Sequence, residues 1–223
     1  MEKELTFASL FCEADRSIAY EQLSAYEFPW DALDHISAII NELIASLPRD
    51  QYEERTPGVW IAHTAKVAPT AYIGAPCIIC EDAEIRHGAF IRGSAIVGRG
   101  AVVGNSVELK NCILFDGAQV PHFNYVGDSI LGYRAHMGAG SITSNVKGDK
   151  TLVTIRLGEG KLETGRKKFG AMLGDYAEIG CNSVLNPGTV IGRNTQVYPL
   201  SSVRGFVPSE SIYKANNVIV KKH

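Results

Sequence analysis

The stretch IAHTAKVAPTAYIGAPCIICEDAEIRHGAFIRGSAIVGRGAVVGNSVEL, residues 61–109, places an aliphatic residue at every sixth position. These positions are Ile61, Val67, Ile73, Ile79, Ile85, Ile91, Val97, Val103 and Leu109. A second position, four residues later, stays small for most of the run: Ala65, Ala71, Cys77, Ala83, Ala89, Ala95 and Ala101. A period of six fits neither an ordinary strand nor a helix. It predicts a parallel β-helix with three short strands per triangular coil.

The same phase breaks near residue 121 and returns in two later stretches. It reappears at Leu131 and Met137, and then runs from Leu173 to Val203. Each coil of such an all-β solenoid buries its faces only against its neighbours. We therefore predict a solenoid domain over residues 58–204. The period does not give its hand, and right-handed crossovers are the general rule for parallel strands.

The break at residues 144–171 predicts one long extruded loop. Several basic residues lie in it: Lys147, Lys161, Arg166, Lys167 and Lys168. A loop of this length in a compact fold is usually functional or disordered. Its basic residues suit a phosphorylated ligand, and a simple solvated loop is the alternative.

The ends of the chain lack the six-residue phase. Residues 1–57 are predicted to form a helical N-terminal segment, with an apolar stripe after Pro29 at helical spacing: Leu33, Ile36, Ile40, Leu43 and Ile44. We expect the stripe to pack on the end of the solenoid, as a cap, or on another subunit. Residues 205–223 are expected to form a C-terminal tail.

The composition excludes several classes of partner. A net charge of -2 implies no strongly basic face, which argues against nucleic acid and anionic membranes. There is no apolar run of about 18 residues to span a bilayer, and the first residues lack a signal-peptide core. Five scattered cysteines suit a reducing compartment. We therefore predict a cytoplasmic protein.

Cys77 and Cys80 have the spacing of a zinc-binding pair. In the six-residue frame, however, Cys77 is a small inward position, whereas Cys80 follows the inward Ile79 and should point outward. The two thiols then face different ways. A structural role is favoured, and no metal site is expected.

Residues 103–128 are richer in polar and aromatic groups than the repeats before them. His122 lies near Tyr125 and Asp128 in sequence, and Lys110 lies on the preceding coil. Side chains on neighbouring coils stack at about 4.7–4.9 Å. We therefore expect Lys110 and His122 to serve one cleft, although a lone histidine is more often structural than catalytic.

Residues 103 to about 203 resemble the acetyltransferase domain of the bifunctional bacterial N-acetylglucosamine-1-phosphate uridylyltransferase / glucosamine-1-phosphate acetyltransferase, a hexapeptide-repeat protein. The resemblance rests on GNSVELK at 104–110, HFNYVGD at 122–128, GAGSITSN at 138–145, and KF at 168–169 before LGD at 173–175. FPWDAL at 28–33 also looks like the linker between the halves of archaeal sugar-phosphate nucleotidylyltransferases. No Gly-rich start precedes it, so we expect the nucleotidylyltransferase half to be absent.

The resemblance implies a left-handed β-helix that assembles as a homotrimer, with acyl-CoA in the groove between subunits. By position, His122 matches the general base of the family. The sugar-phosphate contacts are matched by Arg92, Lys110, Tyr125 and Lys168, with His136 in place of an asparagine. The acyl-CoA contacts are matched by Ala139 and Asn145, with Cys181 in place of a serine near the CoA. A further departure from the family is Val146, which stands where the family has a tyrosine.

These observations predict a CoA-dependent N-acyltransferase, in the simplest case an acetyltransferase that uses acetyl-CoA. Its acceptor would be an amino-sugar phosphate or a nucleotide-linked amino sugar. A histidine, with an ordinary pKa of about 6.5, can take the proton of the attacking amine near neutral pH.

Two other classes of function are weighed against this one. The first is a non-catalytic trimer that binds sugar nucleotides or regulates a separate nucleotidylyltransferase. The second is a carbonic anhydrase of the hexapeptide type, which needs three converging histidine ligands. The close histidine pair of that family is missing here, which disfavours this second alternative.

Overall fold

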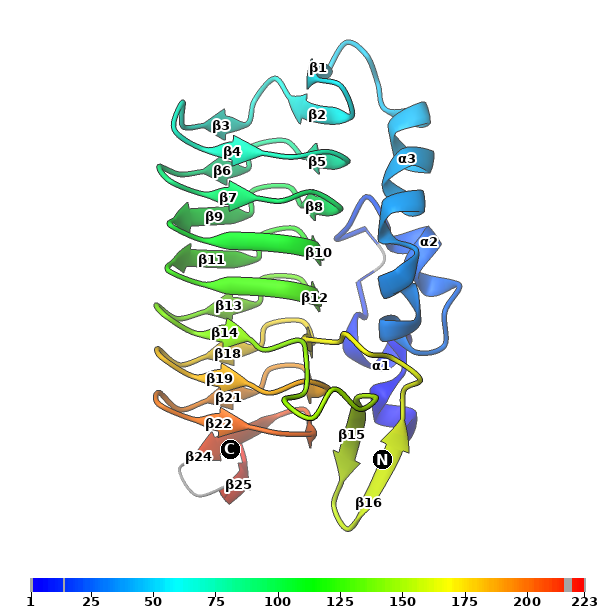
Figure 1. Ribbon diagram of the computed structural model, residues 1–223, viewed down its shortest axis with the longest axis vertical. Helices are drawn as coiled ribbons and strands as arrows, with labels where there is room; N and C mark the ends of the chain where they lie inside the picture. The colour runs from blue at the N-terminus through cyan, green and yellow to red at the C-terminus, as the bar shows by residue number, and fades with distance from the viewer. Residues whose placement is uncertain (1, 14, 215–217, 223) are drawn as a thin grey trace.

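The computed structural model describes residues 2–13, 15–214 and 218–222. Its parallel β-solenoid lies beside an N-terminal helical segment (Figure 1). The segment contains 3-10 helices Glu2–Leu5 and Pro29–Asp34 and helices α1 (Phe7–Leu10), α2 (Tyr20–Ser24) and α3 (Ile36–Ser46). The predicted all-β solenoid with a helical N-terminal segment is confirmed.

Three faces make up each coil. Face I contains β2 (Val59–Ala62), β5 (Cys77–Ile79), β8 (Ala95–Val97), the second halves of β10 (Glu108–Leu114) and β12 (Tyr125–Leu131), β17 (Ala171–Leu173), β20 (Thr189–Ile191) and β23 (Phe206–Val207). Face II contains β3 (Lys66–Val67), β6 (Glu84–Ile85), β9 (Val102–Asn105), β11 (Gln119–His122), β13 (His136–Met137), β18 (Glu178–Ile179), β21 (Gln196–Val197) and β24 (Ser211–Lys214). Face III contains β4 (Tyr72–Ile73), β7 (Phe90–Ile91), the first halves of β10 and β12, β14 (Ile142–Thr143), β19 (Val184–Leu185) and β22 (Ser202–Val203).

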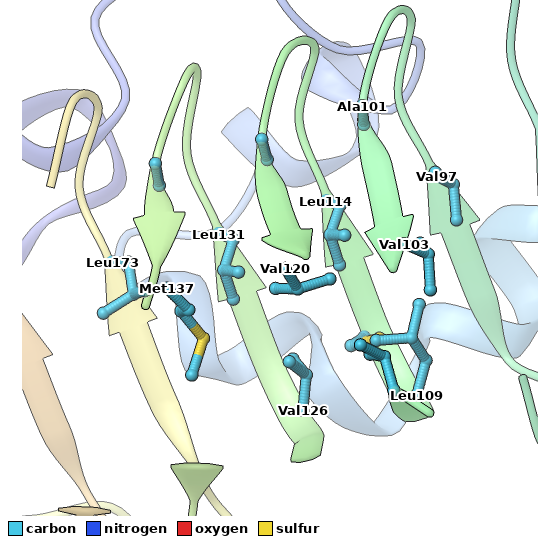
Figure 2. Packing of buried hydrophobic residues seen from close by; sticks show 14 of the residues in the cluster. Val97, Ala101, Val103, Leu109, Leu114, Val120, Val126, Leu131, Met137 and Leu173 are labelled. Carbon is cyan, nitrogen blue, oxygen red and sulfur yellow. The ribbon is translucent and has the colours of Figure 1, made fainter. Parts of the chain in front are cut away.

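The interior is filled by the residues that the six-residue phase selects. Figure 2 shows Val97, Val103 and Leu109 in one buried cluster with Leu114 and Val120. After Leu109 the next small inward residue is Cys112 and the next large one is Leu114, each one position early, because β10 runs on around the corner between faces III and I. The break in phase therefore reflects a shortened corner, and the solenoid continues through it.

A second apolar column lies on the outside of face I. Register aligns its members on successive coils: Trp60, Ile78, Ile96, Ile113, Ile130, Met172, Val190 and Phe206. Helix α3 packs on β5, β8 and β10, and its Ile36 and Ile40 are buried in the same cluster as Ile96. The expectation that the helical stripe covers the solenoid end or another subunit is therefore wrong. It covers the flank of its own solenoid, because burying each of these large side chains contributes about 1.5–3 kcal/mol.

The two cysteines of the CxxC pair face different ways, as predicted. Cys77 lies in the solenoid interior, and Cys80 lies in the cluster between face I and the helical segment. Both are free thiols. Within the described ranges, no group of three or more histidine, cysteine or acidic side chains is arranged to hold a metal ion.

The long loop leaves the solenoid at the corner between faces III and I. It contains an antiparallel hairpin, β15 (Thr154–Leu157) with β16 (Gly160–Glu163), which the sequence did not predict. Arg166 forms ion pairs with Asp31 (3.5 Å) and Asp34 of the helical segment. At least one of the loop's basic residues is thus used in holding the loop to the segment.

Strand pairing also differs from expectation at both ends. β1 (Tyr52–Thr56) pairs antiparallel with β2, inside the segment predicted to be helical. Parallel pairing continues past residue 204 through β23 and β24, where we expected a tail, and β25 (Val218–Lys221) then pairs antiparallel with β24. None of the helices in the described part of the chain has the length and hydrophobicity needed to cross a bilayer.

Candidate functional site

Asp128 organises a polar cluster at the corner between faces III and I. The residue is 3 % exposed. Its carboxylate accepts hydrogen bonds from Lys110 Nζ (3.1 and 3.3 Å), from Asn111 Nδ2 (2.9 Å) and from Asn145 Nδ2. Asp128 and Asn111 both take the left-handed backbone conformation, with φ values of 48° and 50°. Asp and Asn tolerate this conformation better than most residues, which allows the shortened corner.

Tyr125 extends this cluster along face III. Its hydroxyl accepts a hydrogen bond from Asn145 Nδ2 (3.3 Å). Burial, and then the negative charge of Asp128, raise the pKa of the Tyr125 phenol, which therefore stays protonated at neutral pH. Lys110, Tyr125 and Asn145, three of the predicted site residues, are thus brought together.

Arg92 lies next to this cluster on the preceding coil. Its guanidinium donates to Glu108 Oε1 (2.8 Å), and this hydrogen bond raises the pKa of Arg92. Glu108 in turn is in register with Tyr125. Lys168 is exposed in the loop just before Phe169, whose N–H donates to the Asn145 carbonyl (2.9 Å).

His122 lies at a different corner, between faces II and III. Its backbone is fixed on both sides: its N–H donates to Asn124 Oδ1 (3.1 Å), and its carbonyl accepts from the Gly140 N–H (3.0 Å). The buried Asn124 amide also donates to the Gly138 and Ser141 carbonyls (2.9 and 3.0 Å). The backbone is therefore rigid while the residue itself is exposed.

Ala139 and Cys181 belong to the same corner as His122. The Asn182 N–H donates to the Ala139 carbonyl (2.8 Å), which aligns the two coils. A Cβ built on Gly138 would lie 2.7 Å from the Cys181 backbone nitrogen, so glycine allows this close approach. His122, Ala139 and Cys181 therefore form a second group of predicted site residues.

His136 stands apart from both groups, on face II. Its Nδ1 lies 2.9 Å from Glu178 Oε2 on the next coil. Both residues line a cleft of about 950 Å³, which Arg16 of the N-terminal segment also lines, together with Arg134 and Tyr133 of the solenoid. The Arg16 guanidinium stacks 4.7 Å from the centre of the Tyr133 ring.

The expectation of a single cleft for Lys110 and His122 does not hold within one chain. Lys110 is in register with Gly127, at the far end of the face III strand that follows His122. Sequence reasoning also missed Asn111, and it assigned no role to Asp128. The usable signal was an Asn and an Asp at equivalent positions of successive coils, where the six-residue phase slips.

Comparison with known proteins adds evidence on ancestry. The model of the GMPPB C-terminal domain family matches residues 73–157. The bifunctional sugar-1-phosphate nucleotidylyltransferase/acetyltransferase of Sulfurisphaera tokodaii is 28% identical over 205 residues, which cover 89% of this chain and 51% of the relative. The bifunctional protein GlmU of Methanococcus vannielii is 32% identical over 159 residues, which cover 71% of this chain and 34% of the relative.

This chain thus spans about half or less of the length of these two relatives. Among solved structures, a point mutant of perosamine N-acetyltransferase from Caulobacter crescentus, in complex with CoA and GDP-perosamine, aligns with a TM-score of 0.39 and 18% identity. That alignment covers 73% of this chain and 56% of the other. The repeat, the solenoid and the sequence relatives together place this chain among the hexapeptide-repeat β-helix acyltransferases, as a homologue of the C-terminal domain of the bifunctional nucleotidylyltransferase/acetyltransferases.

Proposed function

We propose that this protein is a CoA-dependent N-acyltransferase that acts on an amino-sugar phosphate or a nucleotide-linked amino sugar, with acetyl-CoA as the simplest donor. The observation that carries the proposal is the corner of His122. The residue is exposed on a backbone that Asn124 fixes. It shares its corner with Ala139 and Cys181 on the following coils, to which the family resemblance assigns the acyl-CoA.

His122 would act as the general base. As the acceptor amine attacks the thioester carbonyl, the imidazole takes the proton that the amine loses when the new N–C bond forms. The tetrahedral intermediate then breaks its C–S bond, and the imidazolium returns the proton to the departing thiolate. Lys110, Arg92 and Lys168 would hold the acceptor phosphate, so that the amine meets the thioester.

The distribution of residues supports a homotrimer. Within one chain, His136 lies on face II, whereas Lys110 and Tyr125 lie on face III or its corner with face I. The faces of a triangular coil point in different directions, so a small ligand on one chain does not contact both sets. A neighbouring copy that sets its face II against face III would unite them. Light scattering coupled to size-exclusion chromatography would measure the assembly.

The test is thiol release from acetyl-CoA with a panel of amino-sugar phosphates and nucleotide-linked amino sugars. His122→Ala is expected to lower turnover about 10²–10⁴-fold. His87→Ala is the matched control, since this exposed histidine lies at the same corner on an earlier coil. Its Nδ1 is hydrogen-bonded to the Thr70 hydroxyl (2.7 Å). Equal losses in both variants would contradict the role of His122. Absence of turnover with every acceptor would favour the non-catalytic alternative.

A further inference from the structure

The Asp128 carboxylate connects three parts of the molecule that are distant in sequence. Asn111, which donates to Asp128, also donates to the Leu33 carbonyl of the helical segment (3.0 Å). The Gly170 N–H at the end of the long loop donates to the Asp128 carbonyl (2.8 Å). The solenoid, the segment and the loop therefore meet at this one residue.

The carboxylate also restricts two side chains that are otherwise flexible. Fixing a lysine side chain costs rotamer entropy, and Lys110, with a side chain 27% exposed, is held by both Asp128 oxygens. The Asn145 amide is fixed by its bonds to Asp128 and to the Tyr125 hydroxyl. Their donor groups are thus set in place before any ligand arrives.

We propose that Asp128 is a positioning residue for the acceptor, and that it acts through Lys110 and through the Asn145 amide, which also holds Tyr125, without itself contacting the acceptor. Asn145 then supports the acceptor residues rather than contacting the acyl-CoA, the role that the family resemblance gave it. This inference rests on the proposed acyl transfer and on the phosphorylated amino sugar as its acceptor. It assigns a function to the carboxylate at the shortened corner, and it makes the helical segment part of the support of the site through Leu33 and Asn111.

Asp128→Asn is the test, because it keeps the size of the side chain and removes its charge. The new amide N–H groups would face the donors of Lys110, Asn111 and Asn145. We expect the KM for the acceptor to rise about tenfold or more, as loss of a charged hydrogen bond costs about 1.5–3 kcal/mol. The KM for acetyl-CoA should change less than about twofold.

Asp175→Asn is the matched control. Asp175 is an equally buried carboxylate that binds the helical segment through the Cys12 N–H (2.9 Å), and its other carboxylate partner is the Tyr133 N–H, which is not one of the predicted site residues. We expect this variant to lower the melting temperature and to leave the acceptor KM unchanged. If both variants raise both KM values in parallel, Asp128 is merely structural and the proposal fails.

A double-mutant cycle tests the route of the effect. In a Lys110→Met background, Asp128→Asn should change the acceptor KM much less than it does in the parent protein. An undiminished effect would overturn positioning through Lys110.

Calorimetric binding of glucosamine 1-phosphate separates this proposal from the proposed function. If the parent protein binds the sugar phosphate without turnover, acyl transfer fails, and weaker binding by Asp128→Asn still supports positioning. If Asp128→Asn binds as tightly as the parent, positioning fails whatever the activity. If the parent protein shows neither binding nor turnover, both proposals are overturned.

Discussion

Asp128 and Asp175 are both buried, and both link the helical segment to a corner of the solenoid, but their partners differ in kind. Asp175 accepts two backbone hydrogen bonds, from the Tyr133 N–H and the Cys12 N–H, each 2.9 Å long. Asp128 accepts from the side chains of Lys110, Asn111 and Asn145. Backbone donors fix the course of the chain, whereas side-chain donors are groups that a ligand can also use. The donor type, more than burial, separates the structural corner from the candidate site.

The largest expected effects come from the aromatic residues beneath each corner. The ring of Trp30 packs on that of Phe169 (centroids 5.6 Å apart) near the Asp128 corner, and Phe11 packs on Phe115 (4.9 Å) near the Asp175 corner. Trp30→Ala and Phe11→Ala should each lower the free energy of unfolding by about 3–5 kcal/mol. Urea unfolding measures both values.

Only Trp30→Ala should also raise the acceptor KM, because Phe169 carries the N–H that binds the Asn145 carbonyl. An equal rise in the Phe11→Ala variant would remove the functional distinction between the corners.

A smaller effect is expected at the ion pairs between the loop and the segment. The Arg166 side chain is only 12% exposed beside Asp31 and Asp34, whereas Lys161 pairs with Glu163 in the exposed hairpin. Arg166→Met should cost about 1–3 kcal/mol of unfolding free energy, because two carboxylates and a backbone carbonyl lose their donor.

Lys161→Met should cost less than about 0.5 kcal/mol, as is usual for exposed pairs. Thermal unfolding at two salt concentrations compares the two variants. Equal costs would show that the loop is not anchored to the segment through Arg166.

The smallest expected effect is a pH dependence at Asp175. Burial raises the pKa of this carboxyl, against the opposing effect of its two N–H donors. The folded state then holds the proton more tightly than the unfolded chain, so stability falls as pH rises from about 4 through the raised pKa. Asp175→Asn should remove this pH dependence. The total loss of stability that it removes is about 1.4 kcal/mol for each unit by which the pKa in the folded state exceeds that in the unfolded state.

Asp149 provides a contrast of opposite sign for the same urea measurements. Hydrogen bonds from Thr151 lower the pKa of Asp149, so the stabilisation that the ionised Asp149 gives the folded state is lost as pH falls. The free energy of unfolding of the parent protein is compared with that of Asp175→Asn at each pH. If the difference moves in favour of the parent as pH rises, the pKa of Asp175 is not raised by folding.

The interior of the solenoid could be predicted because it needs only one period. The covered flank could not, although it leaves a trace in the sequence. Where a strand has three consecutive apolar residues, as in Cys77–Ile79 and Ala95–Val97, the middle residue points away from the interior and must be covered by something else, and all three are buried in the structure. The pattern tells that a cover exists, whereas only the fold shows that helix α3 provides it.

The site was predicted in its residue types and only partly in its arrangement. Lys110, Tyr125 and Asn145 come together because their coils are stacked. Their connection through Asp128 depends on a corner that is one residue shorter, with Asn111 and Asp128 in the left-handed conformation. A six-residue frame continued without that slip would place Ile113 and Tyr125 inside the solenoid, since side chains alternate between faces. In the structure Ile113 lies on the covered flank and Tyr125 lies in the polar cluster.

The antiparallel strands at the two ends of the solenoid affect its behaviour in solution. A parallel ladder with bare ends offers unpaired N–H and C=O groups to another molecule, and stacking of copies end to end would lead to fibres. On one face at each end, β1 and β25 reverse direction and form the outermost strand (Figure 1). The outer edge in β1 carries Glu53, Glu54 and Arg55, all exposed. The charged side chains and the reversed direction of the outermost strands therefore oppose the end-to-end stacking of copies into fibres.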